Sequence, residues 1–388
     1  MKKLLIGMAI LLALVIFVVR PIAVRMQDDS MNTVLEHEPY PISPAAAQLH
    51  ATLTVGDWHA DTTLWERSME GRHDYGHLDL SRMQEGNLGL QMFTSVTKSP
   101  SGQNYESNET SAGDNITKLA IAQLWPIASW SSLKERALFQ AMRVHRLAKD
   151  RPEDFTVIVT KSDFHAWTLA REANSDFVGG LIGTEGSHAL DGDLANIDVL
   201  FDAGFRMMSL QHFFDNKLGG SLHGISGKGL TQFGKQALEM MQAKDIIVDV
   251  SHSSEAVVSD VLAHSKKPLV VSHTGFKGHC DTSRNISDEL MQRIAAGGGI
   301  IAVGFWDAAV CGTSPSAIVA AIEYGIKLVG EDHVSLGSDY DGTVETSFDA
   351  SELAVLTQAM LDKGMPEEVI RKVMGENMVK FLEQNLPD

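Results

Sequence analysis

The sequence predicts an α/β fold, a (β/α)8 TIM barrel, and three observations lead to this prediction. Eight short apolar runs rich in β-branched residues alternate with longer segments of helical periodicity. Parallel strands need long crossover connections, and closing such a sheet into a barrel removes both exposed edges. The chain has 388 residues, which one barrel with loop insertions can occupy as a single unit. An open, doubly wound sheet is the alternative fold.

The predicted strands and helices follow each other along most of the chain. Amphipathic patterns predict helices over residues 235–244, 255–264 and 287–296. Segment 97–115 is rich in Ser, Gly and Asn, so it is expected to overhang the carboxyl end of the barrel. The sequence does not decide whether this segment is a mobile lid or a solvated insertion without a role. The eight strands are expected at residues 53–56, 89–94, 178–183, 206–210, 246–250, 268–271, 299–304 and 333–337.

The N-terminal segment has a different pattern. Lys2 and Lys3 precede an uncharged apolar run over residues 4–19, which is typical of an export segment. No small-x-small cleavage site follows, so a signal anchor over residues 1–25 is expected, with a cleaved signal peptide or a buried core helix as alternatives. Residues 26–44 are expected to form a polar linker and residues 45–388 the barrel domain. The barrel would then be exported, bound to the membrane through the N-terminal segment or secreted if that segment is cleaved.

Charge and cysteine content exclude two classes of protein. The formal net charge is −18, which repels a polyanion, so no nucleic-acid partner is expected. Cys280 and Cys311 are the only cysteines, so no disulfide framework holds the fold together. The sequence does not decide whether these two residues form a disulfide bond with each other.

Several predicted strands end in residues that bind metals. His59 and Asp61 form an HxD motif after the first, Glu185 follows the third, and His252 and His273 follow the fifth and sixth. In a barrel the carboxyl ends of the strands face one pocket, and imidazole with carboxylate suits zinc or another divalent transition ion. Five such ligands are enough for two metals if Glu185 bridges them, which predicts hydrolytic rather than redox chemistry. A structural polar cluster is the alternative.

Longer motifs run through most of the chain from about Val55 onward. They include VGDWHADTTLW, GLIGTEGSHAL, MMSLQH, VDVSHSSEAV, VVSHTGF, SRNISDELM and LGSDYDG. With these motifs the chain resembles the membrane dipeptidase (renal dipeptidase) family of zinc metallopeptidases, which are amidohydrolase-like barrels. Gln211 replaces the threonine common in that family before the fourth-strand histidine, and the asparagine and proline of the first motif are also replaced, so side-chain preference cannot be carried over.

The resemblance implies a dinuclear zinc dipeptidase that hydrolyses L-Xaa-L/D-Xaa dipeptides through a metal-bridging hydroxide. It places two Zn²⁺ in each chain: His59 and Asp61 would hold one, His252 and His273 the other, and Glu185 would bridge them as a catalytic residue.

The same resemblance implies three further roles. His212 would contact the scissile carbonyl oxygen, and Arg284 would bind the terminal carboxylate of the substrate. Asp339, rather than Asp341, would be the catalytic acid and base.

Two other functions and one partner stay open at this point. The first is a related metal-dependent amidohydrolase acting on acyl amino acids, lactams or lactones. The second is a non-catalytic, membrane-tethered binding protein. A homodimer is the one macromolecular partner left open besides the membrane.

Overall fold

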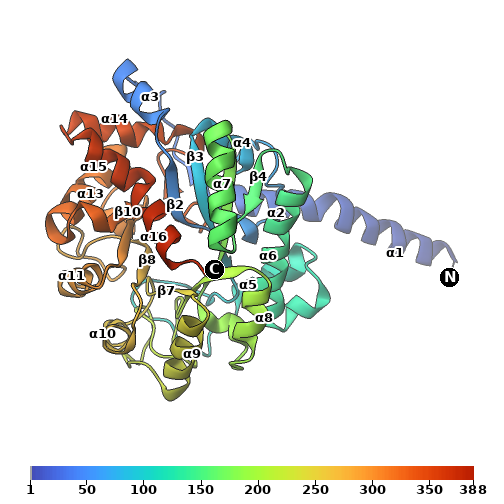
Figure 1. Cartoon of the computed structure of the whole chain (residues 1–388). Helices are drawn as coiled ribbons and strands as arrows, with labels where there is room; N and C mark the ends of the chain where they lie inside the picture. The colour runs from blue at the N-terminus through green and yellow to red at the C-terminus, as the bar shows by residue number, and fades with distance from the viewer. Residues whose placement is uncertain (1) are drawn as a thin grey trace.

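The computed structural model describes residues 2–388, which form a closed barrel of parallel strands (Figure 1). Around the barrel the strands follow chain order, and β3 also pairs with β5, which closes the ring. This closure confirms the predicted barrel and excludes the open sheet. The barrel strands are β2 (Val55–Ala60), β3 (Leu88–Val96), β5 (Val178–Glu185), β6 (Phe205–Ser209), β7 (Ile247–Asp249), β8 (Val270–Thr274), β9 (Ile300–Val303) and β10 (Val334–Leu336).

All eight predicted runs form barrel strands, with ends that differ by a few residues. A ninth strand, β4 (Phe155–Val157), was not predicted. It is three residues long and pairs only with the first residues of β5. Such a short run carries too little periodicity to be recognised in the sequence.

Helices surround the barrel and bury their apolar faces against it. The predicted helix over residues 255–264 is α10 (Glu255–His264), which begins where the Ser254 side chain accepts a hydrogen bond from the backbone of Val257. The other larger helices are α6 (Leu133–Asp150), α7 (Lys161–Ala173), α9 (Gln232–Ala243), α11 (Asp288–Ala296), α13 (Pro315–Val329) and α14 (Ala354–Asp362). Shorter ones are α3 (Pro44–His50), α4 (Leu80–Glu85), α5 (Asn115–Ala122), α8 (Asn196–Asp202), α12 (Asp307–Val310) and α15 (Glu367–Arg371).

The last helix closes the amino end of the barrel. Met378, Phe381 and Leu382 of α16 (Asn377–Asn385) belong to the same buried cluster as strand residues such as Trp58 and Met207. The bottom of the barrel is therefore filled by side chains, and only the carboxyl end of the strands is left for a site.

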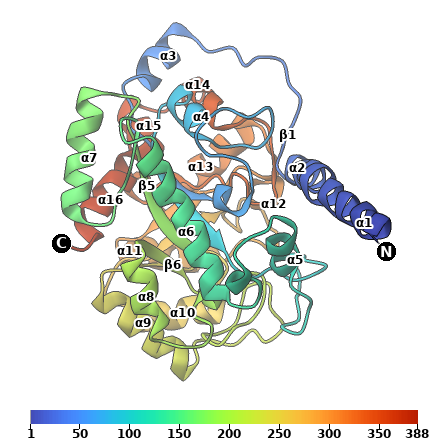
Figure 2. The ribbon, with the colours of Figure 1, turned by 90° about the vertical axis from the view of Figure 1, so that its right-hand side faces the viewer.

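The N-terminal segment is helical and projects from the barrel (Figure 2). It consists of α1 (Lys2–Leu14), a π-helical turn (Val15–Val19) and α2 (Arg20–Met31). Among residues 2–388, no helix combines the length and the apolar character needed to cross a membrane.

The segment predicted as a polar linker is largely ordered against the barrel. Part of it lies in α2, and β1 (Thr33–Val34) pairs in parallel with β11 (Glu345–Thr346). The buried Asp28 carboxylate lies against the guanidinium of Arg67, 2.5 Å away. Asp28 of this segment therefore has a buried partner that is distant in sequence, and the predicted domain boundaries stay a prediction.

The two cysteines form a disulfide between the loops that follow β8 and β9. Cys280 and Cys311 have Cα atoms 5.6 Å apart and are separated by 31 residues. This bond joins the two loops that carry Arg284 and Trp306.

Candidate active site

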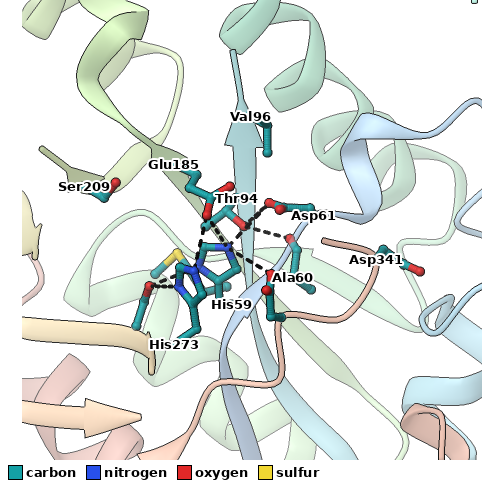
Figure 3. A network of polar contacts seen from close by, with 12 residues as sticks. His59, Ala60, Asp61, Thr94, Val96, Glu185, Ser209, His273 and Asp341 are labelled. Atoms are coloured by element: carbon teal, nitrogen blue, oxygen red, sulfur yellow. Dashed lines mark hydrogen bonds and ion pairs between the residues drawn. The ribbon is translucent and has the colours of Figure 1, made fainter. Parts of the chain in front are cut away.

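Side chains from four barrel strands converge at the carboxyl end of the barrel, as the sequence predicts (Figure 3). Nε2 of His252 lies 2.9 Å from Nε2 of His273 and 3.0 Å from Oε1 of Glu185. Nε2 of His59 lies 3.6 Å from both Oδ1 of Asp61 and Oε1 of Glu185. All five residues are buried. Glu185 lies between the two pairs, which is the position expected of a bridging ligand.

The arrangement fits a metal centre better than it fits a polar cluster held by its own hydrogen bonds. In the described residues, Nε2 of His59 is buried without a hydrogen-bond partner. Two imidazole nitrogens 2.9 Å apart cannot both keep a proton between them. Lone pairs that meet at one point, together with carboxylate oxygens, form the donor set that zinc prefers.

A serine and an aspartate behind the site fix the orientation of two histidine rings. Oγ of Ser272 lies 3.0 Å from Nδ1 of His59 and 2.9 Å from Nδ1 of His273. The same hydroxyl donates its proton to Oδ2 of Asp249 at 2.7 Å, so its oxygen accepts hydrogen bonds from the Nδ1–H groups of both rings. In both rings Nε2 therefore carries the free lone pair and points toward the centre. A hydrogen bond from the other ring nitrogen is the usual support of metal-binding histidines.

Burial sets the electrostatics of this centre. It raises the pKa of Glu185 well above its ordinary value, and nearby Asp61 adds to that effect. Burial lowers the pKa of His252 and His273 well below the ordinary range. For His59 burial alone would lower the pKa, but Asp61 and Glu185 outweigh it and raise the pKa. Neutral imidazoles beside acidic groups provide the lone pairs that a cation needs.

His212 lies next to the centre from the end of β6. Its Nε2 is 3.3 Å from Oε2 of Glu185, and its Nδ1 is 3.0 Å from the carbonyl oxygen of Lys98. A carbonyl only accepts, so Nδ1 carries the proton of the neutral ring and Nε2 carries the lone pair. Burial lowers the pKa of His212 to about 4.

The two aspartates after β10 have different surroundings. Asp339 lies at the cavity, with Oδ1 at 3.9 Å from Nε2 of His59, and its pKa is raised well above the ordinary value by burial and by Asp61. Asp341 points away: its carboxylate accepts from the Thr62 hydroxyl at 2.6 Å and pairs with buried Arg67. Asp339 therefore lines the cavity, whereas Asp341 does not.

Arg284 is buried at the side of the mouth formed by β7 and β8. Its two terminal nitrogens donate to the carbonyl oxygens of Ser251, at 3.1 Å, and His273, at 2.6 Å. Its Cζ lies 5.2 Å from the centre of the Trp306 ring. Among residues 2–388 no carboxylate lies within ion-pair distance of this buried guanidinium.

A cavity of about 360 Å³ lies at this end of the barrel, and its lining includes Asp61, Glu185, His212, His252, Arg284 and Asp339. Part of its lining comes from segment 97–115, where Tyr105 lies with its hydroxyl 3.0 Å from Nε1 of Trp306. The buried amide of Asn108 in the same segment donates to the carbonyl of His223 at 3.0 Å. This segment therefore packs over the mouth, as predicted, and is not a solvated insertion.

Sequence reasoning overlooked Tyr105 and Trp306 as residues around the cavity. Tyr105 is the one aromatic residue in a polar stretch of nineteen residues, 97–115, and that contrast is a signal that could have found it. Trp306 follows the seventh barrel strand by three residues, the same offset at which His212, His252 and Asp339 follow their strands.

Three further histidines, His188, His223 and His279, lie outside the centre. His188 is buried against Phe214 and has no hydrogen-bond partner in the described residues. His223 lies 2.8 Å from the Tyr105 carbonyl, and His279 packs on Tyr324. None of them lines the cavity.

Comparison with known proteins places this site in a family. A dipeptidase from Aspergillus terreus, ataJ, is 26% identical over 392 residues, covering 91% of this chain and 89% of that protein. Two solved structures share the fold. One is a metallopeptidase from Rhodobacter sphaeroides bound to a phosphinate mimic of L-Ala-D-Ala, with TM-score 0.69, 22% identity and coverage of 86% of this chain and 99% of the other.

The second is the probable dipeptidase PvdM from Pseudomonas aeruginosa, with TM-score 0.72, 19% identity and coverage of 88% and 97%. The sequence profile of the membrane dipeptidase family matches residues 44–386, nearly the whole region that forms the barrel and its helices. With the converging site side chains at the mouth of that barrel, the chain belongs to the membrane dipeptidase family, peptidase family M19.

Proposed function

We propose that this protein is a dinuclear zinc dipeptidase. One observation carries the proposal: His252, His273 and Glu185 bring two nitrogens and an oxygen within 3.3 Å of each other, next to Arg284, which has no carboxylate partner among residues 2–388. His59 and Asp61 would hold one zinc, His252 and His273 the other, and Glu185 would bridge both. When bound, zinc supplies Lewis acidity, which lowers the pKa of water and polarises a carbonyl group.

Arg284 would select the substrate by its free terminal carboxylate. A guanidinium offers a planar fork of N–H donors that matches a carboxylate. Fixed by two backbone carbonyls, it would hold the carboxylate at a set distance from Glu185, so that the peptide bond of a dipeptide reaches the centre. Longer peptides would place a different bond there.

His212 and Asp339 would handle charge and protons. Negative charge on the carbonyl oxygen favours protonation of Nε2 of His212, which could then donate a hydrogen bond to that oxygen. Asp339 would take the proton of the attacking water and return it to the leaving amine. Its raised pKa suits an acid that is protonated during part of the cycle.

The test is hydrolysis of Ala-Ala and of Ala-D-Ala by protein stripped with chelator and then given zinc. Turnover should appear only with metal, with about two zinc ions per chain by metal analysis. Asp339→Asn should lower kcat by about 10²- to 10⁴-fold, while its thermal unfolding stays close to that of the parent.

Two results would contradict the proposal. An unchanged turnover rate after treatment with chelator would show that the reaction does not need a metal. Hydrolysis of acyl amino acids or lactones in preference to any dipeptide would favour the related amidohydrolase function.

We further propose that the barrel is exported and held at a membrane by its N-terminal segment. Leu4, Leu11 and Phe17 on that segment are 69%, 61% and 76% exposed, so their apolar side chains face solvent. The disulfide between Cys280 and Cys311 is of a kind that persists in oxidising compartments. After cell fractionation the full chain should sediment with membranes and resist carbonate extraction. Recovery in the soluble cytoplasmic fraction, with free thiols, would contradict this.

A further inference from the structure

The side of the cavity that faces Arg284 across the barrel has an apolar wall. In the ring of strands, β3 is separated from β8 by β5, β6 and β7 in one direction and by β2, β10 and β9 in the other. The guanidinium of Arg284 is fixed at the β7 and β8 side. The end of β3 therefore lies across the mouth from the group that would bind the substrate carboxylate.

Three apolar side chains form this wall: Leu64, Val96 and Ile116. Val96 shares a face of β3 with Thr94, whose hydroxyl donates to Oδ1 of Asp61 at 2.6 Å. Because side chains two residues apart on a strand point the same way, Val96 also faces the barrel interior. Val96 is also paired in register with Glu185, at the ends of both strands, and Figure 3 shows it beyond Thr94 at the tip of β3.

The wall is backed by a rigid cluster rather than by a mobile loop. Leu64, Val96 and Ile116 pack with Trp65 and Trp125 in a separate buried core. Ile116 is held in the first turn of α5, where Asp114 accepts from its backbone at 3.0 Å. Asp114 in turn pairs at 2.6 Å with buried Arg136. The wall is therefore a preformed surface.

The charges around the cavity also disfavour an acidic side chain at this wall. The acidic residues Asp61, Glu106, Glu185 and Asp339 line it, and Arg284 is the one Lys or Arg side chain in the described lining. An acidic side chain bound at the wall would lose water and gain no cation, because Arg284 is on the far side. The side chains of Leu64, Val96 and Ile116 carry no donor or acceptor, so they offer a polar side chain no hydrogen bond.

We infer that the enzyme selects dipeptides whose first residue has an apolar side chain, held by Leu64, Val96 and Ile116. This inference rests on the proposed function. With the terminal carboxylate on Arg284 and the peptide bond at Glu185, the first residue extends toward the end of β3. Its side chain then covers the wall and removes apolar surface from water.

The experiment compares three first residues of similar shape, in Leu-Ala, Asn-Ala and Asp-Ala, with Gly-Ala as the reference. For the zinc-loaded full chain, kcat/KM for Leu-Ala should exceed that for Asn-Ala and for Asp-Ala by about tenfold or more. Val96→Thr keeps the shape of the side chain but adds a hydroxyl, so it should lower kcat/KM for Leu-Ala several-fold and leave Gly-Ala within about twofold. A purely structural defect would lower both alike.

Val157→Thr provides the matched control, because Val157 lies on β4 outside the cavity lining. It should leave the ratio of Leu-Ala to Gly-Ala unchanged. Asn-Ala or Asp-Ala cleaved as efficiently as Leu-Ala, with Gly-Ala turnover intact, would overturn this inference alone. Failure to cleave any of the four dipeptides with zinc present would overturn the proposed function, and this inference with it.

Discussion

Individual residues in this site act through the partners that fix them. Arg284 is the clearest case, because its guanidinium is buried, lies 5.2 Å from the Trp306 ring centre and is oriented by two backbone carbonyls. Burial lowers its pKa from the ordinary value, although nearby Tyr105 and Asp339 oppose that effect. A desolvated cation without a carboxylate partner has strong affinity for one that the substrate supplies.

We predict that Arg284→Lys lowers kcat/KM for Ala-Ala by about 10- to 100-fold, because lysine lacks the planar fork and cannot keep both backbone contacts. The free dipeptide should also lose its advantage over its C-terminal amide. Steady-state kinetics on both substrates checks this. Arg293→Lys, at an exposed position in the last turn of α11, is the matched control. An unchanged preference for the free carboxylate in Arg284→Lys would remove this role.

At the scale of elements, loops after the strands place the chemistry and need support of their own. The loop after β8 carries Arg284, and the loop after β9 carries Trp306. The disulfide joins these two loops through Cys280 and Cys311, which are 31 residues apart in sequence. The sequence left this bond open, since cysteine spacing alone does not give the distance between two loops.

Reducing this disulfide should lower the free energy of unfolding by about 3 to 4 kcal/mol, because the unfolded chain regains the entropy of a closed loop of this length. KM for Ala-Ala should rise as well, since the loop that carries Arg284 is no longer covalently linked to the loop after β9. Urea unfolding with and without reductant measures the first effect. The double variant Cys280→Ser and Cys311→Ser should be insensitive to reductant. Equal stability of the oxidised and reduced parent would contradict the prediction.

For the whole molecule, buried neutral histidines make stability depend on pH. Burial lowers the pKa of His188 to about 3, of His212 to about 4 and of His223 to about 3, from an ordinary value of 6.5. Between about pH 4 and pH 6.5, each of these three histidines therefore binds more protons in the unfolded chain than in the folded chain. Stability rises with pH wherever the unfolded state binds more protons, so it is lost as pH falls through this range.

Each of these three histidines should therefore contribute a loss of up to about 1.4 kcal/mol of stability per pH unit to the metal-free protein as pH falls from 6.5 toward 4. Thermal unfolding at several pH values measures this slope. His188→Gln should reduce the slope, whereas His165→Gln, at an exposed position on α7, should keep it. A His188→Gln variant whose Tm changes with pH as steeply as that of the parent would contradict the prediction.

The sequence by itself determined the eight barrel strands, the helix over residues 255–264, the family and the residues that meet at the barrel mouth. This was possible because strand ends can be read from local apolar patterns, and the barrel brings all carboxyl ends to one side. Family membership is confirmed by the match over residues 44–386. The roles given to His59, Asp61, Glu185, His252 and His273 stay predictions.

Only the tertiary structure decided the pairing of Cys280 with Cys311, the burial of Asp28 against Arg67, the position of Tyr105 and the apolar wall across from Arg284. Each of these depends on contacts between segments far apart in the chain, which local periodicity does not encode. Periodicity gives the direction of a side chain relative to its own strand or helix. Which other segment it meets is set by how the loops fold back over the barrel.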